Sequence, residues 1–321
     1  MTSASKPPFP GESRGPASGS DPEPGFRRGA GAALGPSETA SILVQALPYI
    51  RRFAGKSVVV KLGGAAIDKE LDRALAQDVL LLRSVGVRCV LVHGGGPQVN
   101  AVMERMGKQP EFRDGLRVTD AETLDIVRMV LVGKVNRDLV ATINGEAGEE
   151  PVAVGVSGED AGFLVTTPRD PALGFVGDVT QVRAGLIHQL LDDGLTPVVS
   201  TIGADASGQP YNVNADDAAR AIAAAMGAEK IIYLTAAPGL LEDVNDETSL
   251  VPRLTVAELR ARIEHESVSR GMIPKLRACA EAVEGGVGTA HIIDGRVQHA
   301  LLVELLTDQG IGTMIKKEAD W

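Results

Sequence analysis

The chain is short of cysteine, of aromatic residues and of long apolar runs, and each shortage excludes a class of protein. Its two cysteines, Cys89 and Cys279, cannot build a disulfide framework, so a reducing cytoplasm is the simplest location. Aromatic residues make up 3% of the 321 residues, which weakens any case for stacking on nucleic-acid bases. No apolar run approaches the roughly 18 residues that a membrane-spanning helix needs. We therefore expect a cytoplasmic protein that binds neither nucleic acid nor membrane.

Positive charge is also scarce. The sequence has 32 lysines and arginines against 42 aspartates and glutamates, which gives a net charge of −10. This balance argues against a general attraction to nucleic acid or to anionic lipid. The cations that contact an anionic ligand must therefore be few and specifically placed.

The first 36 residues differ in composition from the rest of the chain. Proline, glycine and serine account for 19 of these 36 residues. Such a segment cannot bury enough apolar surface to offset the entropy that it would lose on ordering. Residues 1–36 are therefore predicted to form a disordered tail rather than a secretory leader, and an unselected extension is favoured over a regulatory arm.

Residues 37–54 are predicted to form a helix with an apolar stripe. The stripe consists of residues at helical spacing, Leu43, Ala46, Leu47, Ile50 and Phe53. Pro48 is expected to kink or divide this helix, because proline removes one backbone donor and clashes with the preceding turn. The stripe needs a covering surface, and the sequence leaves open whether the same domain or another subunit provides it.

Beyond this helix, short β-branched runs alternate with helical patterns. The expected strands are 57–61, 88–92, 151–156, 196–202, 230–235 and 288–293. One expected helix ends near residue 85. The others span about 97–106, 120–144, 183–193, 214–227, 255–266 and 270–285. Segment 162–182 has no long helical pattern and is expected to form a β-hairpin. This alternation predicts an α/β fold with a mostly parallel sheet covered by helices on both faces.

Two glycine-rich turns follow predicted strands in the N-terminal half, Lys61-Leu-Gly63-Gly64 and His93-Gly94-Gly95-Gly96. Glycine lets backbone N–H groups approach an anion closely, and ligands of parallel α/β sheets bind at the carboxyl ends of strands. Neither turn matches the common phosphate-loop or dinucleotide-binding patterns, and a plain turn would explain either alone. Lys61 favours a functional site, since a lysine ending a buried apolar strand is unusual.

Three further segments combine polar residues with helix starts or turns. Tyr211–Asp217 holds two asparagines and two aspartates before an Ala-rich helix, which is more than a helix cap requires. Lys275 follows Pro274 at another helix start, and Arg117 follows a glycine turn from which it could hold a carboxylate in a bidentate pair. Taken singly, each could be a cap or a surface residue. The five histidines have no metal-ligand spacing.

Six segments in one order carry a family resemblance: VVVKLGG, LVHGGGPQVN, GLRVT, VVSTIG, NVNADDAA and GMIPK. Over about residues 38 to 315 the chain resembles the amino-acid kinase family, in particular its members that act on N-acetyl-L-glutamate. The resemblance implies a three-layer αβα sandwich with an amino-acid-binding lobe at 55–228 and a nucleotide-binding lobe at 229–321. It implies ATP-dependent phosphorylation of the γ-carboxylate to N-acetylglutamyl 5-phosphate in arginine biosynthesis. Mg²⁺ would enter with ATP, and no tightly bound cofactor is expected.

The resemblance also assigns roles to individual residues. The two catalytic lysines and the aspartate that orients them match Lys61, Lys275 and Asp216. Arg117 and Asn212 match the residues that hold acetylglutamate. The glycines that face the transferred phosphoryl group match Gly63, Gly64, Gly95 and Gly96, of which the last two also belong to the substrate site. The chain departs from the family at Ala236 and Arg270, which affects the adenine side rather than the reaction.

The resemblance extends to the arginine-inhibited, hexameric members of the family, which carry an extra N-terminal helix. The matching inhibitor-site residues are Tyr49, Arg52, Lys230, His291, Glu304 and Gly310. Glu304 could pair with the guanidinium of free arginine. A homo-oligomer built as a trimer of dimers is expected, joined through the helix at 37–54. Whether a nitrogen-signalling protein also binds is not readable from the sequence.

Other activities of this fold fit less well. An aspartate kinase would carry a long regulatory extension, and carbamate, uridylate and glutamate 5-kinases depart from the NVNADDAA and GLRVT patterns. A kinase for acetylaminoadipate stays open, because one methylene is worth only about 1–3 kcal/mol of discrimination. A catalytically silent arginine sensor is disfavoured, since both lysines and Asp216 are retained.

Overall fold

The computed structural model describes residues 35–63, 69–265, 268, 272–308 and 310–319. The chain divides into two compact units, Met1–Ile42 and Leu43–Trp321. In the first unit, the described residues contain the start of helix α1 (Pro36–Phe53). Nearly all of the expected tail, together with Gly64, Arg270 and Gly271, lies outside the described residues.

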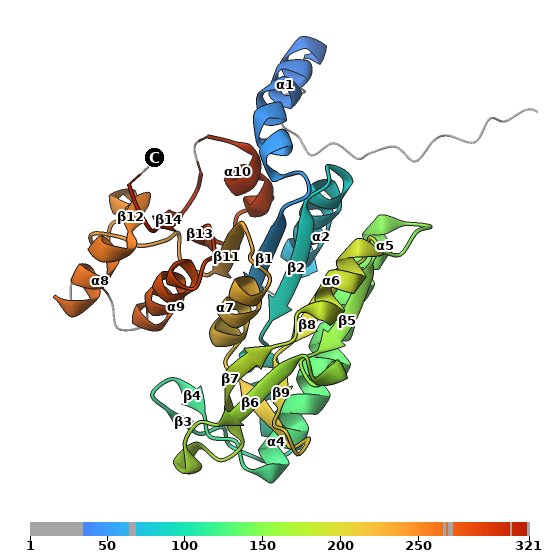
Figure 1. Cartoon of the computed structure of the whole chain (residues 1–321), viewed down its shortest axis with the longest axis vertical. Coiled ribbons are helices and arrows are strands. Elements are labelled where there is room, and N and C mark those ends of the chain that lie inside the picture. The colour runs from blue at the N-terminus through green and yellow to red at the C-terminus, as the bar shows by residue number, and fades with distance from the viewer. Residues whose placement is uncertain (1–34, 64–68, 266–267, 269–271, 309, 320–321) are drawn as a thin grey trace, which may run out of the picture. The chain divides into compact units, whose positions relative to one another are not determined.

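The second unit is built on an eight-stranded sheet (Figure 1). Its strands lie in the order β12 (Arg253–Thr255), β14 (Thr313–Lys316), β13 (Thr289–Asp294), β11 (Lys230–Thr235), β1 (Ser57–Leu62), β2 (Arg88–His93), β8 (Thr196–Ser200) and β5 (Ala153–Ser157). All neighbours pair in parallel except β13 and β14. The α/β class with a mostly parallel sheet is therefore confirmed.

Helices cover both faces of this sheet, because successive strand residues point to opposite sides. Val58 and Val60 of β1 belong to a core with α2 (Lys69–Ser84), α3 (Gly96–Arg105), α5 (Asn136–Ala147) and α10 (Ala300–Leu306). Val59 belongs to a second core with α6 (Gly185–Asp192), α7 (Ala215–Ala225), α8 (Val256–Glu264) and α9 (Ile273–Glu284). Lys61 shares the face of Val59, and this face carries α7 and α9.

Smaller sheets lie near the carboxyl ends of the central strands. The segment expected to be a hairpin contains β6 (Leu164–Pro168) and β7 (Val176–Val182), which pair antiparallel as predicted. With β9 (Ile202–Ala204) and β10 (Pro210–Val213) they form a small closed sheet. A further hairpin joins β3 (Phe112–Arg113) to β4 (Leu116–Arg117). Single 3-10 turns span Asp160–Gly162, Pro171–Leu173 and Glu247–Ser249.

Two helices differ from their expected form. The pattern at 120–144 is α4 (Ala121–Arg128) and α5 separated by a π-helical segment, Met129–Val135. Helix α1 runs without interruption through Pro48, so Pro48 does not divide it, and the alternative expectation of a kink stays a prediction. Because Pro48 has no N–H group, the carbonyl of Val44 one turn earlier has no donor within the helix. Both residues are exposed, so water can hydrogen-bond to that carbonyl.

Helix α10 is fixed to α2 by a buried carboxylate. Asp78 of α2 is 2% exposed, and its Oδ1 lies 2.6 Å from Nδ1 of His299, which immediately precedes α10. The backbone N–H groups of Leu301 and Leu302 also donate to Asp78, so this side chain caps α10 from another element. Burial raises the pKa of Asp78, and the contact with His299 opposes that rise.

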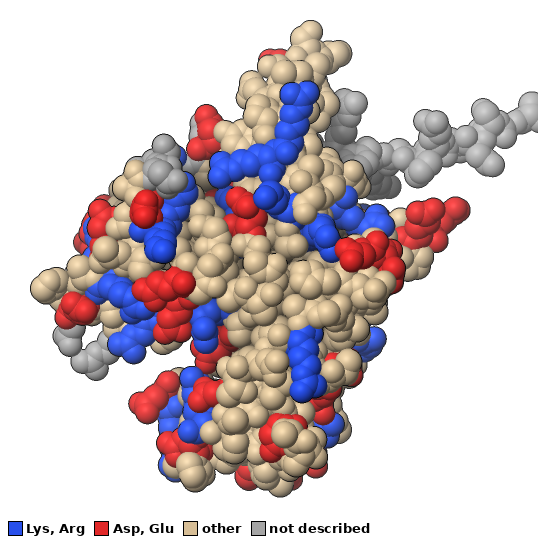
Figure 2. All heavy atoms as spheres, viewed as in Figure 1, with Lys and Arg blue, Asp and Glu red and all other residues tan. Residues whose placement is uncertain are grey.

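Charged side chains of both signs are interspersed over the face shown in Figure 2. Among the residues that the structure describes, no helix has the length and apolarity to cross a bilayer.

Candidate active site

Two lysines from different elements meet one aspartate beyond the carboxyl end of β1. The Nζ atom of Lys61, in β1, lies 2.6 Å from Oδ1 of Asp216. The Nζ atom of Lys275, in the first turn of α9, donates to Oδ2 of the same carboxylate at 3.0 Å. Lys61 and Asp216 are 7% and 9% exposed, whereas the Lys275 side chain is 29% exposed. The three residues that sequence reasoning assigned to catalysis are thus in direct contact.

Local sequence explains why these side chains converge. Asn214 caps α7, since its Oδ1 accepts hydrogen bonds from the backbone N–H groups of Asp216 at 2.8 Å and Asp217 at 3.2 Å. The cap and the helix dipole favour a carboxylate in this first turn. Pro274 occupies the start of α9, where its missing N–H costs nothing, and it places Lys275 facing α7.

Contacts among these three side chains shift the pKa values of Asp216 and Lys61. Burial alone would raise the pKa of Asp216, but the attraction of Lys61 and Lys275 outweighs burial and keeps that pKa below its ordinary value. Burial is the largest influence on Lys61 and lowers its pKa, although Asp216 opposes this. We take Asp216 as ionised at neutral pH, because two cations share its two oxygens.

The lysines border a cavity of about 320 Å³. Its lining includes seven of the nine residues predicted for catalysis, substrate binding or phosphate binding: Lys61, Gly95, Gly96, Arg117, Asn212, Asp216 and Lys275. Apolar side chains of Val99, Val127, Leu131 and Val176 cover other parts of the wall. The cavity therefore combines a cationic end with an apolar lining, as a small carboxylate ligand with an aliphatic chain requires.

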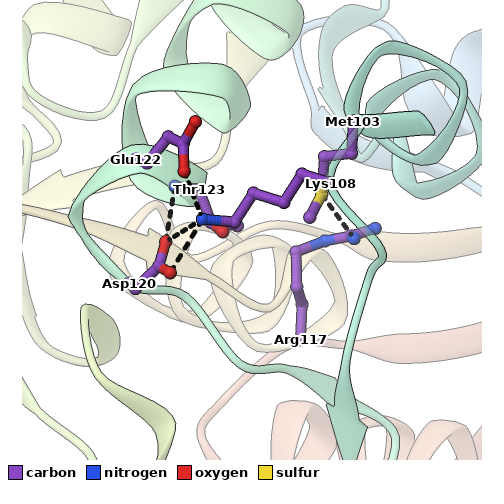
Figure 3. A network of polar contacts seen from close by, with 6 residues as sticks. All are labelled: Met103, Lys108, Arg117, Asp120, Glu122 and Thr123. Carbon is purple, nitrogen blue, oxygen red and sulfur yellow. Dashed lines mark hydrogen bonds and ion pairs between the residues drawn. The ribbon is translucent and has the colours of Figure 1, made fainter. Parts of the chain in front are cut away.

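Arg117 lies in this wall with neutral partners. It is 8% exposed, and its Nη2 donates to Oδ1 of Asn100 at 2.6 Å and to the carbonyl of Gly96 at 3.3 Å. Its Nη1 lies 3.2 Å from the sulfur of Met103 (Figure 3). Among the described residues no carboxylate lies within 4.0 Å of its guanidinium. A buried cation without an anionic partner is suited to bind an anionic ligand.

Asn212 completes the polar part of the cavity wall. Its Nδ2 donates to the hydroxyl of Thr119 at 3.2 Å, and that hydroxyl donates to the carbonyl of Arg117 at 2.9 Å. The two predicted substrate residues are therefore connected through Thr119, which is fully buried.

The glycines predicted to lie in the site occupy structurally different positions. A Cβ at Gly95 would meet Leu131 at 2.6 Å and Val135 at 3.2 Å, so only glycine lets the turn pack against the π-helical segment. A Cβ at Gly96 would meet nothing within 4 Å, because this residue faces the cavity. Gly63 donates its N–H to the carbonyl of Leu234 at 3.0 Å and is absent from the cavity lining. Gly64 lies outside the described residues.

Sequence reasoning missed a buried pair beneath the second glycine turn. Nδ1 of His93 lies 2.8 Å from the carbonyl of Gly94, and Nε2 lies 3.0 Å from Nδ2 of Asn136. Burial lowers the pKa of His93 to about 4, so the ring is neutral at pH 7, donates from Nδ1 and accepts at Nε2. Asn136 within the long helical pattern was the available signal, since an asparagine inside a helix often uses its side chain to hydrogen-bond other groups.

A second missed cluster closes the segment that carries Arg117. Figure 3 shows Lys108 reaching Asp120 and Glu122, and its Nζ lies 2.8 Å from carboxylate oxygens of both. Asp120 also caps α4 by accepting from the backbone N–H of Thr123 at 2.8 Å. Hydrogen bonds from Lys108 and Thr123 lower the pKa of Asp120 to about 2. These contacts join the two ends of segment 108–120, from which Arg117 enters the cavity.

A second cavity, of about 270 Å³, gathers the other predicted set. All six residues assigned to an inhibitor site line it: Tyr49, Arg52, Lys230, His291, Glu304 and Gly310. Phe53, from the end of α1, is buried in the same wall, with Lys230 Nζ 5.1 Å and Arg52 Cζ 5.5 Å from its ring centre. The last turn of α1 is thus one side of this cavity.

Glu304 is the buried carboxylate of the second cavity, whose lining also includes the exposed Asp308. Its Oε1 lies 2.5 Å from Nδ1 of His291, and its Oε2 accepts from the backbone N–H of Ile311 at 3.0 Å. Burial would raise the pKa of Glu304, but the contacts with His291 and Ile311 and the charge of Lys230 together outweigh burial and lower it. Burial lowers the pKa of His291, and it lowers the pKa of Lys230 to about 8. The cavity thus holds the buried carboxylate of Glu304 beside several basic side chains, among them Arg52 and Lys230.

Within the described part of the chain, no group of three or more His, Cys, Asp or Glu side chains could hold a metal ion. Both oxygens of Asp216 are engaged by the two lysines.

Comparison with known proteins gives a consistent result. A model of the amino acid kinase family matches residues 56–294. The acetylglutamate kinase of Acaryochloris marina is 50% identical over 281 residues, which cover 87% of this chain and 98% of that protein. The acetylglutamate kinase of Nostoc punctiforme is 48% identical over 276 residues, which cover 85% of this chain and 92% of that protein.

Solved structures share the fold. N-acetylglutamate synthase from Neisseria gonorrhoeae, complexed with coenzyme A and N-acetyl-glutamate, aligns with a TM-score of 0.77 at 28% identity, over 87% of this chain and 64% of that one. The same synthase complexed with coenzyme A and L-arginine aligns with a TM-score of 0.77 at 29% identity, over 87% and 66%. A Giardia carbamate kinase aligns with a TM-score of 0.61 at 19% identity, over 83% and 100%.

Proposed function

This chain belongs to the amino acid kinase family, and from that premise we propose that it transfers the γ-phosphoryl group of ATP to the γ-carboxylate of N-acetyl-L-glutamate. The product is the acyl phosphate N-acetylglutamyl 5-phosphate, an intermediate of arginine biosynthesis. The observation that carries this proposal is the contact of Lys61 and Lys275 with Asp216 at the edge of a cavity that also holds Arg117. Relatives at 45–50% identity over most of the chain are acetylglutamate kinases.

The chemistry needs cations rather than a base. A carboxylate is already ionised at pH 7, so its attack on phosphorus requires no proton removal. The obstacle is repulsion between two anions and the charge on the phosphoryl oxygens in the transition state. Lys61 and Lys275 supply positive charge from two elements, and Asp216 fixes their direction. Backbone N–H groups of the turn at Gly95 and Gly96 add neutral donors beside them.

The substrate's carboxylate at the α-carbon is assigned to Arg117, with Asn212 beside it. The guanidinium has neutral partners and faces the cavity, which suits a bidentate pair. The lobe at 55–228 accordingly holds the amino acid, and the lobe at 229–321 holds ATP. ATP carries Mg²⁺ in its substrate complex, and the ion neutralises phosphate charge there.

Trapping the acyl phosphate tests this function. Purified protein with ATP and Mg²⁺ should form a hydroxamate when hydroxylamine and N-acetyl-L-glutamate are present. Acetylaminoadipate and aspartate, offered in parallel, should react more slowly. Equal or faster reaction with acetylaminoadipate would transfer the assignment to that substrate, and no hydroxamate with any acceptor would refute an acyl-phosphate kinase.

A second role, inhibition by free arginine, is favoured by the second cavity. Glu304 there is an ionised carboxylate that a guanidinium could pair with, and Tyr49, Arg52 and Gly310 complete the wall. One synthase structure of the same fold contains L-arginine. We assign the cavity of this chain to arginine on these grounds.

Assembly follows from the same helix. On α1, Leu43, Val44 and Leu47 are 67%, 68% and 40% exposed, which is an apolar surface that needs a cover. We assign it to the matching helix of a neighbouring subunit, so that three dimers form a hexamer. The two buried, free cysteines suit a cytoplasmic enzyme.

A further inference from the structure

The β3–β4 hairpin places an aromatic ring against the substrate-site arginine. Phe112 and Arg117 are opposite partners in this hairpin, and Cζ of Arg117 lies 4.8 Å from the centre of the Phe112 ring. Both residues line the active-site cavity. Phe112 is nevertheless 49% exposed, so it is not a core residue. Its position is therefore unexplained by packing in the core.

The remaining edges of the guanidinium are already fixed by α3. Asn100 and Met103 contact its two terminal nitrogens, and the carbonyl of Gly96 accepts from one of them. None of these partners carries charge. Without the ring, the exposed side of the guanidinium would be open to water, and the arginine could leave the cavity wall.

The hairpin itself is built to hold its shape. Its turn residues Asp114 and Gly115 have φ values of 50° and 79°, the left-handed geometry of a tight two-residue hairpin turn. The N–H of Val118 donates to the carbonyl of Glu111 at 2.9 Å, and Lys108 joins the segment's start to Asp120 (Figure 3). Phe112 thus presents its ring from a short, closed segment rather than from a free loop.

We propose that Phe112 is a positioning residue for the substrate, which holds the plane of Arg117 toward the cavity by a cation–π contact and covers it from water. This inference rests on the proposed function, because Arg117 is taken to bind the α-carboxylate of the acetylated amino acid. The charged group that lies over the Phe112 ring is Arg117 and neither of the lysines, so we expect its effect to fall on amino-acid binding and to leave the chemical step unchanged.

Kinetics of Phe112→Ala test the proposal. The KM for N-acetyl-L-glutamate should rise about 3- to 30-fold, the range expected for one lost cation–π contact. The kcat and the KM for ATP should stay within about twofold of wild type, since uniform substrate binding is lost. Calorimetric titration with N-acetyl-L-glutamate should give the same fold-change in Kd.

Two conservative variants and one matched control separate the effect of the aromatic face from the effect of side-chain size. Phe112→Tyr should keep a KM near that of wild type, whereas Phe112→Leu should fall between Phe112→Ala and wild type, because leucine covers the arginine but has no π face. Arg113→Ala changes the neighbouring exposed residue of β3, which is absent from the cavity lining, and should leave the KM unchanged.

Each outcome has a distinct meaning. An unchanged KM in Phe112→Ala, or full recovery in Phe112→Leu, would overturn the inference while leaving the kinase assignment intact. Wild-type protein that neither binds nor phosphorylates N-acetyl-L-glutamate would overturn the proposed function and this inference with it. A KM that rises in Phe112→Ala and recovers fully only with tyrosine would establish the ring's role.

Discussion

At the scale of single residues, the two lysines do not have equal surroundings. Lys61 is buried at the end of a strand, and Lys275 is partly exposed at a helix start, yet both contact Asp216. Because the two lysines share one carboxylate, removal of either one lets the other pair with both oxygens and shift its position. Each substitution alone should therefore disturb the active centre.

We expect Lys61→Ala and Lys275→Ala each to lower kcat by about 100-fold or more, the scale of a lost transition-state donor. The measurement is steady-state kinetics with both substrates saturating. Lys56→Ala, a surface lysine whose side chain is 54% exposed, is the matched control and should keep full activity. Near-normal kcat in either active-site variant would exclude that lysine from the mechanism.

Lys230 predicts a pH dependence of arginine inhibition. Its pKa of about 8 means that it loses its charge between pH 7 and 8.5, while His291, whose pKa is lowered, is already neutral and Glu304 is already ionised. A cationic ligand should then meet less repulsion, so the arginine concentration for half-inhibition should fall about two- to fivefold over this range. In Lys230→Met this dependence should disappear. Inhibition that weakens as pH rises would contradict the assignment.

Sequence reasoning singled out residues of an unusual type at an unusual place, and the family resemblance then supplied their roles. Lys61 ends an apolar strand, and Asp216 belongs to a polar run before an Ala-rich helix. Phe112, Lys108 and His93 gave no such signal. Their roles depend on which residues lie opposite them in the folded chain, and a cross-strand partner or a buried hydrogen bond is not written in local sequence.

At the scale of elements, α10 connects the second cavity to the rest of the fold. It carries Glu304, and its first turn is capped by Asp78 from α2. Asp78→Ala should uncap α10 and leave His299 without its partner. We expect a loss of about 1–3 kcal/mol in unfolding free energy.

The same variant should weaken arginine inhibition more than fivefold while kcat stays near that of wild type, because α10 does not line the catalytic cavity. Chemical denaturation and an arginine titration measure the two effects. Asp192→Ala removes a surface carboxylate, 61% exposed and paired with Arg88, and serves as control. Stability loss with unchanged inhibition would make Asp78 a structural cap alone.

Element boundaries were predictable where the apolar pattern was long and regular. Strands β1, β2, β11 and β13 were placed within one or two residues of their observed ends. The short strands β12 and β14 were missed, because three or four residues give no period to read and their pairing joins distant segments. The π-helical segment was also missed, since its apolar residues fit a 3.6-residue period well enough.

At the scale of the whole molecule, the proposal makes α1 necessary for hexamer formation and for arginine inhibition. Deleting residues 1–36 should leave a hexamer that arginine inhibits, because the helix stays almost complete. Deleting residues 1–53 should give an active dimer with arginine inhibition lost or much weakened, since Tyr49, Arg52 and Phe53 leave the second cavity.

Light scattering and arginine titration of both truncated proteins and of the full chain test this expectation. A full-length protein that is dimeric and indifferent to millimolar arginine would refute the regulatory proposal. It would leave the kinase reaction untouched, because the catalytic residues lie outside α1.

The π-helical segment Met129–Val135 restricts which changes in chain length this lineage can accept. A π turn contains one residue more than the α turn it replaces, so loss of any one residue here would restore regular α geometry. The helix before the deletion would rotate by about 100° relative to the helix after it. Leu131 would leave Gly95, and Arg128 would leave Glu159, to which it donates at 2.7 Å. Substitutions at exposed positions such as Met129 and Lys134 should therefore be tolerated, whereas deletion of a single codon should be selected against even when every sequence motif is retained.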